Sequence, residues 1–211
     1  MTQDLCAVCA LDTADVDAAM AHLGCDGRVV TLAPTDLATV LGSVDDLGAA
    51  VGAEAAAARL VAGLRARLDA VAARVAGAAP VATLVLEWTD PPWAPGHWIP
   101  EMVATAGGRC LLGTPGGRSA RVTWDDVAAC APEVVVCAPC GFDVGAAADA
   151  TRDLLSRGLL PGDVPVWAVD ANASWTRPGP RLVDGVDDLA AILHPGRADG
   201  PPPETRAVRL R

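Results

Sequence analysis

The residues best suited to acid–base chemistry lie in one short segment, Glu87–Trp98, which reads EWTDPPWAPGHW. Within it, His97 can pair with the carboxylate of Glu87 or Asp90 as a general acid and base, or it can bind a metal ion. A histidine that is hydrogen-bonded within its own loop is an equally good interpretation. If the protein is an enzyme, these three residues are the predicted catalytic acid–base groups, and Cys140 is a predicted nucleophile.

Cysteine spacing is the second candidate for chemistry. Seven cysteines include two CxxC pairs, Cys6–Cys9 and Cys137–Cys140. Four thiolates can hold zinc, but well over a hundred residues separate the pairs, which is far from the spacing of a zinc ribbon. We therefore predict no metal site. Cys6 and Cys9 are alternative nucleophiles or a redox pair, although they lack the expected strand-then-helix context.

Large aromatic and cationic side chains gather in three predicted loops. The rings of these loops can form a flat apolar wall for a ligand, or they can fill the core of a small domain; they are Trp88, Trp93, Trp98, Phe142 and Trp175. Asp143 lies beside them. Arg177 and Arg181 can hold a carboxylate or phosphate, or can bind loop carbonyls.

Alternating strand and helix patterns explain why these loops should meet. Strands are predicted at 82–87, 133–137 and 164–169, and helices at 99–107, 123–130, 145–157 and 182–193. This alternation predicts an α/β fold with a mostly parallel, Rossmann-like sheet. In such sheets ligands bind beyond the carboxyl ends of the strands, where the three loops begin.

The rest of the chain divides by composition. Residues 1–44 read as the remnant of an N-terminal lobe, with a short helix from Asp12, a strand at 28–32 and a cap at Thr35 or Asp36. Residues 45–78 are alanine-rich with apolar residues at helical spacing, which predicts one long linking helix. Residues 79–194 form the predicted ligand-binding lobe. The proline- and arginine-rich tail, 195–211, is predicted to be disordered.

Composition excludes several classes of function. The net charge of −10 argues against a nucleic-acid partner and gives no support to binding at an anionic membrane. All sixteen basic residues are arginine and tyrosine is absent, which rules out a Schiff-base lysine or a tyrosine acid. The N-terminus lacks the pattern of a signal peptide, and seven cysteines suit reduced thiols. We expect a cytoplasmic location.

Taken together, these motifs resemble the cobalamin-binding-protein-like branch of the helical-backbone (class III) solute-binding proteins. The resemblance is carried by EWTDPPWAPGHW, by Pro100-Glu101-Met102, by Pro139–Asp143, by Arg177–Arg181 and by TQDLCAVC near the N-terminus. It implies two lobes joined by a rigid helix and a corrinoid or similar flat ligand. The ligand-binding residues that the resemblance and the loops imply are Gln3, Asp4, Cys6, Trp88, Trp93, Trp98, Phe142, Asp143, Trp175, Arg177 and Arg181, with His97 as an axial contact.

The same resemblance implies partners. In full-length members an N-terminal α/β lobe precedes the TQDLC stretch, so this chain is expected to offer half of an interlobe pocket. We expect a small-molecule ligand, with cobalamin as a candidate and the cofactor otherwise unknown, and a homodimer or a protein partner that covers the open face. The alternative is one subunit of a two-chain enzyme of small-molecule biosynthesis, in which the partner completes the pocket.

Overall fold

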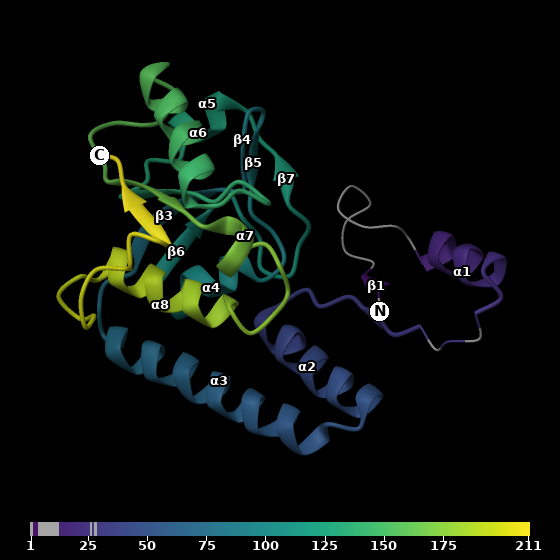
Figure 1. Cartoon of the computed structure of the whole chain (residues 1–211). Helices are drawn as coiled ribbons and strands as arrows, with labels where there is room; N and C mark the ends of the chain where they lie inside the picture. Colours follow the sequence, from purple (N-terminus) through teal and green to yellow (C-terminus); the bar gives the residue numbers. More distant parts are fainter. Residues whose placement is uncertain (1, 4–12, 26, 28) are drawn as a thin grey trace.

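A five-stranded sheet forms the centre of the molecule (Figure 1). The computed structural model describes residues 2–3, 13–25, 27 and 29–211. The strand order is β10-β9-β8-β3-β6. The strands are β3 (Val81–Leu86), β6 (Gly108–Leu111), β8 (Val134–Cys137), β9 (Val166–Val169) and β10 (Ala207–Arg209). All neighbours run parallel except β10, which pairs antiparallel with β9. The predicted mostly parallel α/β fold is therefore confirmed.

Helices cover both faces of this sheet because its strands are apolar on both sides. On β8, Val134 and Val136 pack into one cluster, whereas Val135 and Cys137 pack into another. This alternation is what the two-residue period of a strand requires. The first cluster holds α4 (Ile99–Thr105) and α8 (Leu182–Leu193), and the second holds α5 (Trp124–Ala129) and α6 (Val144–Ser156).

Two helices replace the single long helix predicted for residues 45–78. They are α2 (Leu37–Val51) and α3 (Glu54–Val75). Gly52 ends α2 in the left-handed conformation with φ of 70°, which glycine adopts without strain. The alanine-rich composition favours helix on both sides of this turn and so hides the break. The two helices then pack side by side, and α3 lies along α8 (Figure 1).

The C-terminal tail is ordered, which corrects the prediction of disorder for residues 195–211. Its last residues form β10 on the edge of the sheet. The guanidinium of Arg206 makes two hydrogen bonds of 2.7 Å with the carboxylate of Asp188, which is only 4% exposed. This buried ion pair fixes the tail to α8.

The N-terminal part is small and lies apart from the five-stranded sheet, at the right of Figure 1. It contains β1 (Thr2–Gln3), α1 (Thr13–His22) and β2 (Thr31–Leu32), and β1 and β2 pair in parallel. No helix in the described part of the chain is long and apolar enough to cross a membrane.

Candidate functional site

Four loops meet at the carboxyl edge of the parallel strands. Loop A (87–98) follows β3, loop B (112–123) follows β6, loop C (138–143) follows β8 and loop D (170–181) follows β9. Three of these were predicted from the sequence. Loop B was not, because its strand, β6, begins with Gly108-Arg109 and lacks an apolar run. The Pro- and Gly-rich text that follows (TPGGRS) is the signal that could have revealed it.

Short elements inside the loops make them rigid. Loops A and B form a three-stranded sheet of order β4-β5-β7, with β4 at Trp88–Thr89, β5 at Pro92–Ala94 and β7 at Ala120–Arg121. Loop D begins with α7 (Ala171–Ser174), for which Asp170 is the cap. None of these elements was predicted, since each is too short to show a period.

Hydrogen bonds join the loops to one another. The His97 N–H donates to the Gly117 carbonyl at 2.6 Å, which joins loops A and B. The Cys140 N–H donates to the Glu87 carbonyl at 3.0 Å, which joins loops C and A. The Asn172 N–H donates to the Phe142 carbonyl at 3.0 Å, which joins loops D and C. The four loops therefore act as one connected surface.

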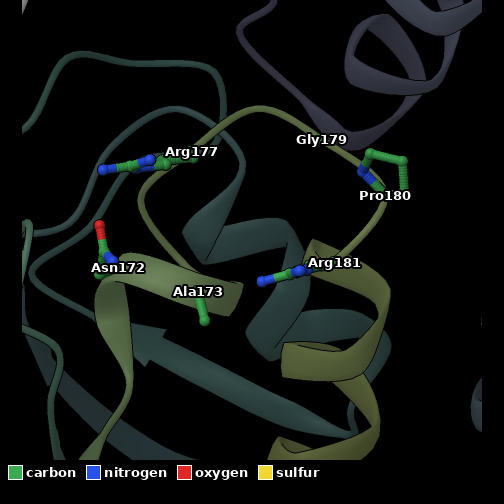
Figure 2. Close-up of a pocket in the computed structure, with 6 residues that line it drawn as sticks. All are labelled: Asn172, Ala173, Arg177, Gly179, Pro180 and Arg181. Atoms are coloured by element: carbon green, nitrogen blue, oxygen red, sulfur yellow. The ribbon is translucent and has the colours of Figure 1, made fainter. Parts of the chain in front are cut away.

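A cavity of about 310 Å³ opens in loop D (Figure 2). Its lining residues are Asn172, Ala173, Arg177, Gly179, Pro180 and Arg181. Arg177 and Arg181 are exposed, and neither side chain has an ion pair or hydrogen bond with any described residue. In Figure 2 the Arg177 side chain extends above Asn172, and the Arg181 side chain extends from the other end of the loop toward Ala173. Two free guanidinium groups and an amide at one cavity can bind an anionic group with several oxygen atoms.

A second cavity, of about 510 Å³, lies between loops A and B. It is lined by Asp90, Pro91, Pro92, Arg121, Val122, Thr123 and Trp124. The carboxylate of Asp90 is paired with Arg157 at 2.9 Å. This cavity therefore offers an anion one guanidinium group, that of Arg121, beside the carboxylate of Asp90, and we regard the loop D cavity, with two guanidinium groups and no carboxylate, as the better anion site.

The five aromatic rings do not form the flat wall expected from the sequence. Trp98 and Trp175 are buried in the main core, with exposed fractions of 5% and 0%. Trp88 and Phe142 are half-buried and pack edge to face, with ring centroids 5.4 Å apart. Trp93 is the most exposed of the five, at 37%. The core interpretation is therefore correct for two rings, because tertiary packing covers them.

The proposed acid–base pairing of His97 is not formed by hydrogen bonds. His97 has no hydrogen bond to Glu87 or Asp90 in the described structure, and Asp90 is paired with Arg157. The pKa of His97 is lowered by burial and, to a lesser degree, by the nearby Arg118 guanidinium. His97 has a positive φ of 51°, so the loop holds a non-glycine residue in a conformation that costs free energy.

Glu87 is the most unusual carboxylate of the site. Burial raises its pKa, and hydrogen bonds from the Ser119 hydroxyl and the Gly96 backbone N–H partly offset this effect. One of its oxygens, Oε2, is buried without a hydrogen-bond partner among the described residues. Buried polar atoms nearly always have partners, so this atom requires an explanation.

Other predicted site residues have structural roles. Asp143 caps α6 by accepting a hydrogen bond from the Ala146 N–H at 2.8 Å. Cys140 is half-buried beside Glu87. Burial raises the pKa of the Cys137 thiol to about 11, which disfavours its reactive thiolate form.

Of the three N-terminal residues predicted to bind the ligand, only Gln3 lies among the described residues. Gln3 lies in β1, opposite Leu32 and apart from the five-stranded sheet (Figure 1). Asp4 and Cys6, with Cys9, lie outside the described residues. Among the residues that are described, no group of three or more histidines, cysteines or acidic residues could hold a metal ion.

Comparison with known proteins identifies the type of molecule. Residues 11–155, more than half of the chain, match the model of a family described as periplasmic binding protein. The search of curated proteins returned no match.

Solved structures show the same fold. A periplasmic heme binding protein from Pseudomonas aeruginosa is 23% identical with a TM-score of 0.72, and the match covers 89% of this chain and 70% of that one. An ABC transporter substrate-binding protein from Listeria monocytogenes is 14% identical with a TM-score of 0.68 (92% and 76% covered). The periplasmic vitamin B12 binding protein of Vibrio cholerae is 19% identical with a TM-score of 0.65 (86% and 70% covered).

Proposed function

We propose a ligand-binding function from one premise: the chain belongs to the periplasmic binding protein family. The proposed ligand is a metal chelate on a flat macrocycle that carries an anionic group. Cobalamin, with its phosphodiester, is the first candidate, and heme, with its two carboxylates, is the second. The names of two structural neighbours, a vitamin B12 binding protein and a heme binding protein, support this choice of ligand class.

One observation carries the proposal: two unpaired guanidinium groups border the same cavity. All five arginines with described ion pairs contact aspartates, as Arg67 and Arg74 do on α3. Arg177 and Arg181 have no acidic partner among the described residues and stand at the carboxyl edge of the sheet, where α/β proteins bind ligands. Their planar, permanently charged groups suit a phosphate or carboxylate.

The size of the cavity limits what it holds. About 310 Å³ is at the lower end for a drug-sized ligand and is too small to enclose a macrocycle. The cavity therefore receives the anionic arm, and the macrocycle lies over the neighbouring loops, where Trp93 offers exposed ring surface. A second protein surface, from a partner or another copy of the chain, would then cover the open face of the ligand.

An absorption titration with hydroxocobalamin, followed by one with hemin, tests the proposal. The wild-type protein should shift the spectrum of at least one of them with a stoichiometry of one. Replacing both arginines (Arg177→Gln with Arg181→Gln) should weaken binding by about tenfold or more, as expected for lost charge-assisted hydrogen bonds. Arg59→Gln, an exposed change on α3, is the matched control.

Two results would contradict the proposal. One is no response to either compound. The other is a double variant that binds as tightly as the Arg59→Gln control.

A further inference from the structure

Glu87 touches three of the four loops at once. Its backbone N–H donates to the Trp93 carbonyl within loop A, and its carbonyl accepts from the Cys140 N–H of loop C. Its side chain accepts hydrogen bonds from the Ser119 hydroxyl of loop B and from the Gly96 N–H of loop A. No hydrophobic contact could make these connections, because each one satisfies a polar group of the loops.

Loops A and B meet closely at the Glu87 side chain. A Cβ atom placed on Gly96 would collide with the Ser119 nitrogen and would lie 2.6 Å from the Gly117 carbonyl oxygen. Next to it, His97 and loop B exchange two backbone hydrogen bonds, His97 N–H to Gly117 and Gly116 N–H to His97. The carboxyl group of Glu87 therefore sits where the two backbones touch.

The connection continues to the loop D cavity. Cys140 is bonded to Glu87, and two residues later the Phe142 carbonyl accepts from the Asn172 N–H. Asn172 lines the cavity that holds Arg177 and Arg181. A displacement of Glu87 can thus reach the cavity through two main-chain hydrogen bonds.

Burying the Glu87 carboxyl group also costs free energy. Its Oε2 atom is buried without a hydrogen-bond partner in the described part of the chain, and a glutamine would fill the same volume without a charge. We propose that Glu87 is a positioning residue that holds loops A, B and C in the geometry that the ligand requires. This inference rests on the proposed ligand-binding function.

The response to pH distinguishes positioning from a purely structural role. The titratable or charged groups on the segments packed against Glu87 are His97, Arg118 and Cys140. Because the folded state raises the pKa of Glu87, its contribution to stability is present at low pH and is lost as the pH rises through that raised value. The hydrogen bonds from Ser119 and Gly96, in contrast, are strongest to the ionised carboxylate.

Stability and ligand affinity should therefore change in opposite directions with pH. As the pH falls through the pKa of Glu87, the contribution of Glu87 to the free energy of unfolding should increase. Over the same range loop B should become less tightly held, and the affinity for the ligand should fall. A side chain that only supports the fold would change both in the same direction. By linkage, hydroxocobalamin should release a proton from Glu87 when it binds near that pH.

The test combines hydrogen exchange with ligand titration. In the free full-length protein, Glu87→Ala should speed amide exchange in residues 112–119 by about tenfold, since losing hydrogen bonds lowers local opening energies by that order. Exchange in α6 should not change. Glu87→Gln should restore protection only in part, because its neutral amide oxygen can accept the same two hydrogen bonds but more weakly than an ionised carboxylate does. Glu204→Gln, at an exposed glutamate in the tail, is the control.

For hydroxocobalamin, Glu87→Ala should weaken binding about tenfold, by the same argument. Glu87→Gln should bind with an affinity that no longer changes as the pH is varied from below to above the raised pKa of Glu87. Unchanged exchange in residues 112–119 of Glu87→Ala would overturn the inference, and so would a wild-type affinity that follows stability with pH. If hydroxocobalamin and hemin do not bind at all, the proposed function fails, whereas the exchange result still decides whether Glu87 positions the loops.

Discussion

The indole N–H of Trp98 donates to the backbone carbonyl of Trp175 at 2.7 Å, and both rings are buried in the core. This contact joins loop A to loop D within the core. It assigns the two tryptophans to the support of the site and leaves Trp93 as the exposed ring.

The first prediction contrasts a buried and an exposed ring. Trp98→Ala should lower the free energy of unfolding by about 3–5 kcal/mol, because it removes a large core side chain and leaves a cavity. Trp93→Ala should change it by about 1 kcal/mol or less, as for most exposed positions. Urea denaturation followed by far-UV circular dichroism measures both. Equal losses in the two variants would contradict the assignment of Trp98 to the core.

Strong local patterns predicted the main elements. The β-branched run of β8 and the apolar spacing of α8 gave elements with nearly the observed bounds, since each carries its own period or propensity. The helix predicted at 123–130 does begin at Thr123, whose side chain caps it by accepting a hydrogen bond from the Asp126 N–H. From such elements the parallel sheet and the edge that carries the loops follow by topology.

Tertiary contacts decided what the sequence could not show. Strand β10 has only three residues, and it forms because it pairs with β9 and because the neighbouring Arg206 binds Asp188. The sequence alone does not distinguish a tryptophan that lines a pocket from one that fills a core. The burial of Trp98 and Trp175 depends on their packing with residues of α4 and α8. The isolation of Arg177 and Arg181 was equally invisible, because it depends on the absence of nearby carboxylates among the described residues.

The second prediction concerns the ordered tail. Arg206→Ala should lower the free energy of unfolding by about 3 kcal/mol, because it leaves the nearly buried carboxylate of Asp188 without its partner. Adding Asp188→Ala should recover part of this loss. Arg152→Ala, which removes an exposed pair with Asp149, should cost about 0.5 kcal/mol or less. Thermal unfolding would measure the three variants. If Arg206→Ala had the same melting temperature as the Arg152→Ala control, the tail would not contribute to stability.

The third prediction is a pH dependence at the start of α2. The Asp36 side chain accepts hydrogen bonds from the Thr39 backbone N–H and hydroxyl, both at 2.7 Å, and these lower its pKa. Its contribution to stability is therefore present above the unfolded pKa of about 3.9 and is lost as the pH falls through the lower folded value. Asp36→Ala should cost about 1 kcal/mol at pH 7.

Asp36→Asn separates the charge from the cap. Its amide oxygen can still accept from the backbone, so it should lose less at pH 7 than Asp36→Ala. The difference between wild type and Asp36→Asn should disappear in acid. Asp45→Asn, an exposed change within α2, should show no such difference across the same pH series. If the wild-type advantage over Asp36→Asn persisted at low pH, the cap would not depend on the ionised carboxylate.

The fourth prediction tests the close approach of loops A and B. Gly96→Ala should destabilise the protein by about 1–3 kcal/mol, the usual cost of forcing atoms into a packed region, because the new methyl group meets the backbone of Ser119 and Gly117. The displacement should separate the Glu87 carboxyl from Ser119, so exchange in residues 112–119 should also increase. Gly63→Ala is the matched control, since Gly63 is an exposed residue of α3 with nothing within 4 Å of the place that a methyl group would occupy. That change should stabilise the helix by about 0.5–1 kcal/mol. Opposite signs for the same glycine-to-alanine change would locate the effect in the contact between the loops, whereas a neutral Gly96→Ala would mean that loop B can move away without loss and that Glu87 does not hold it.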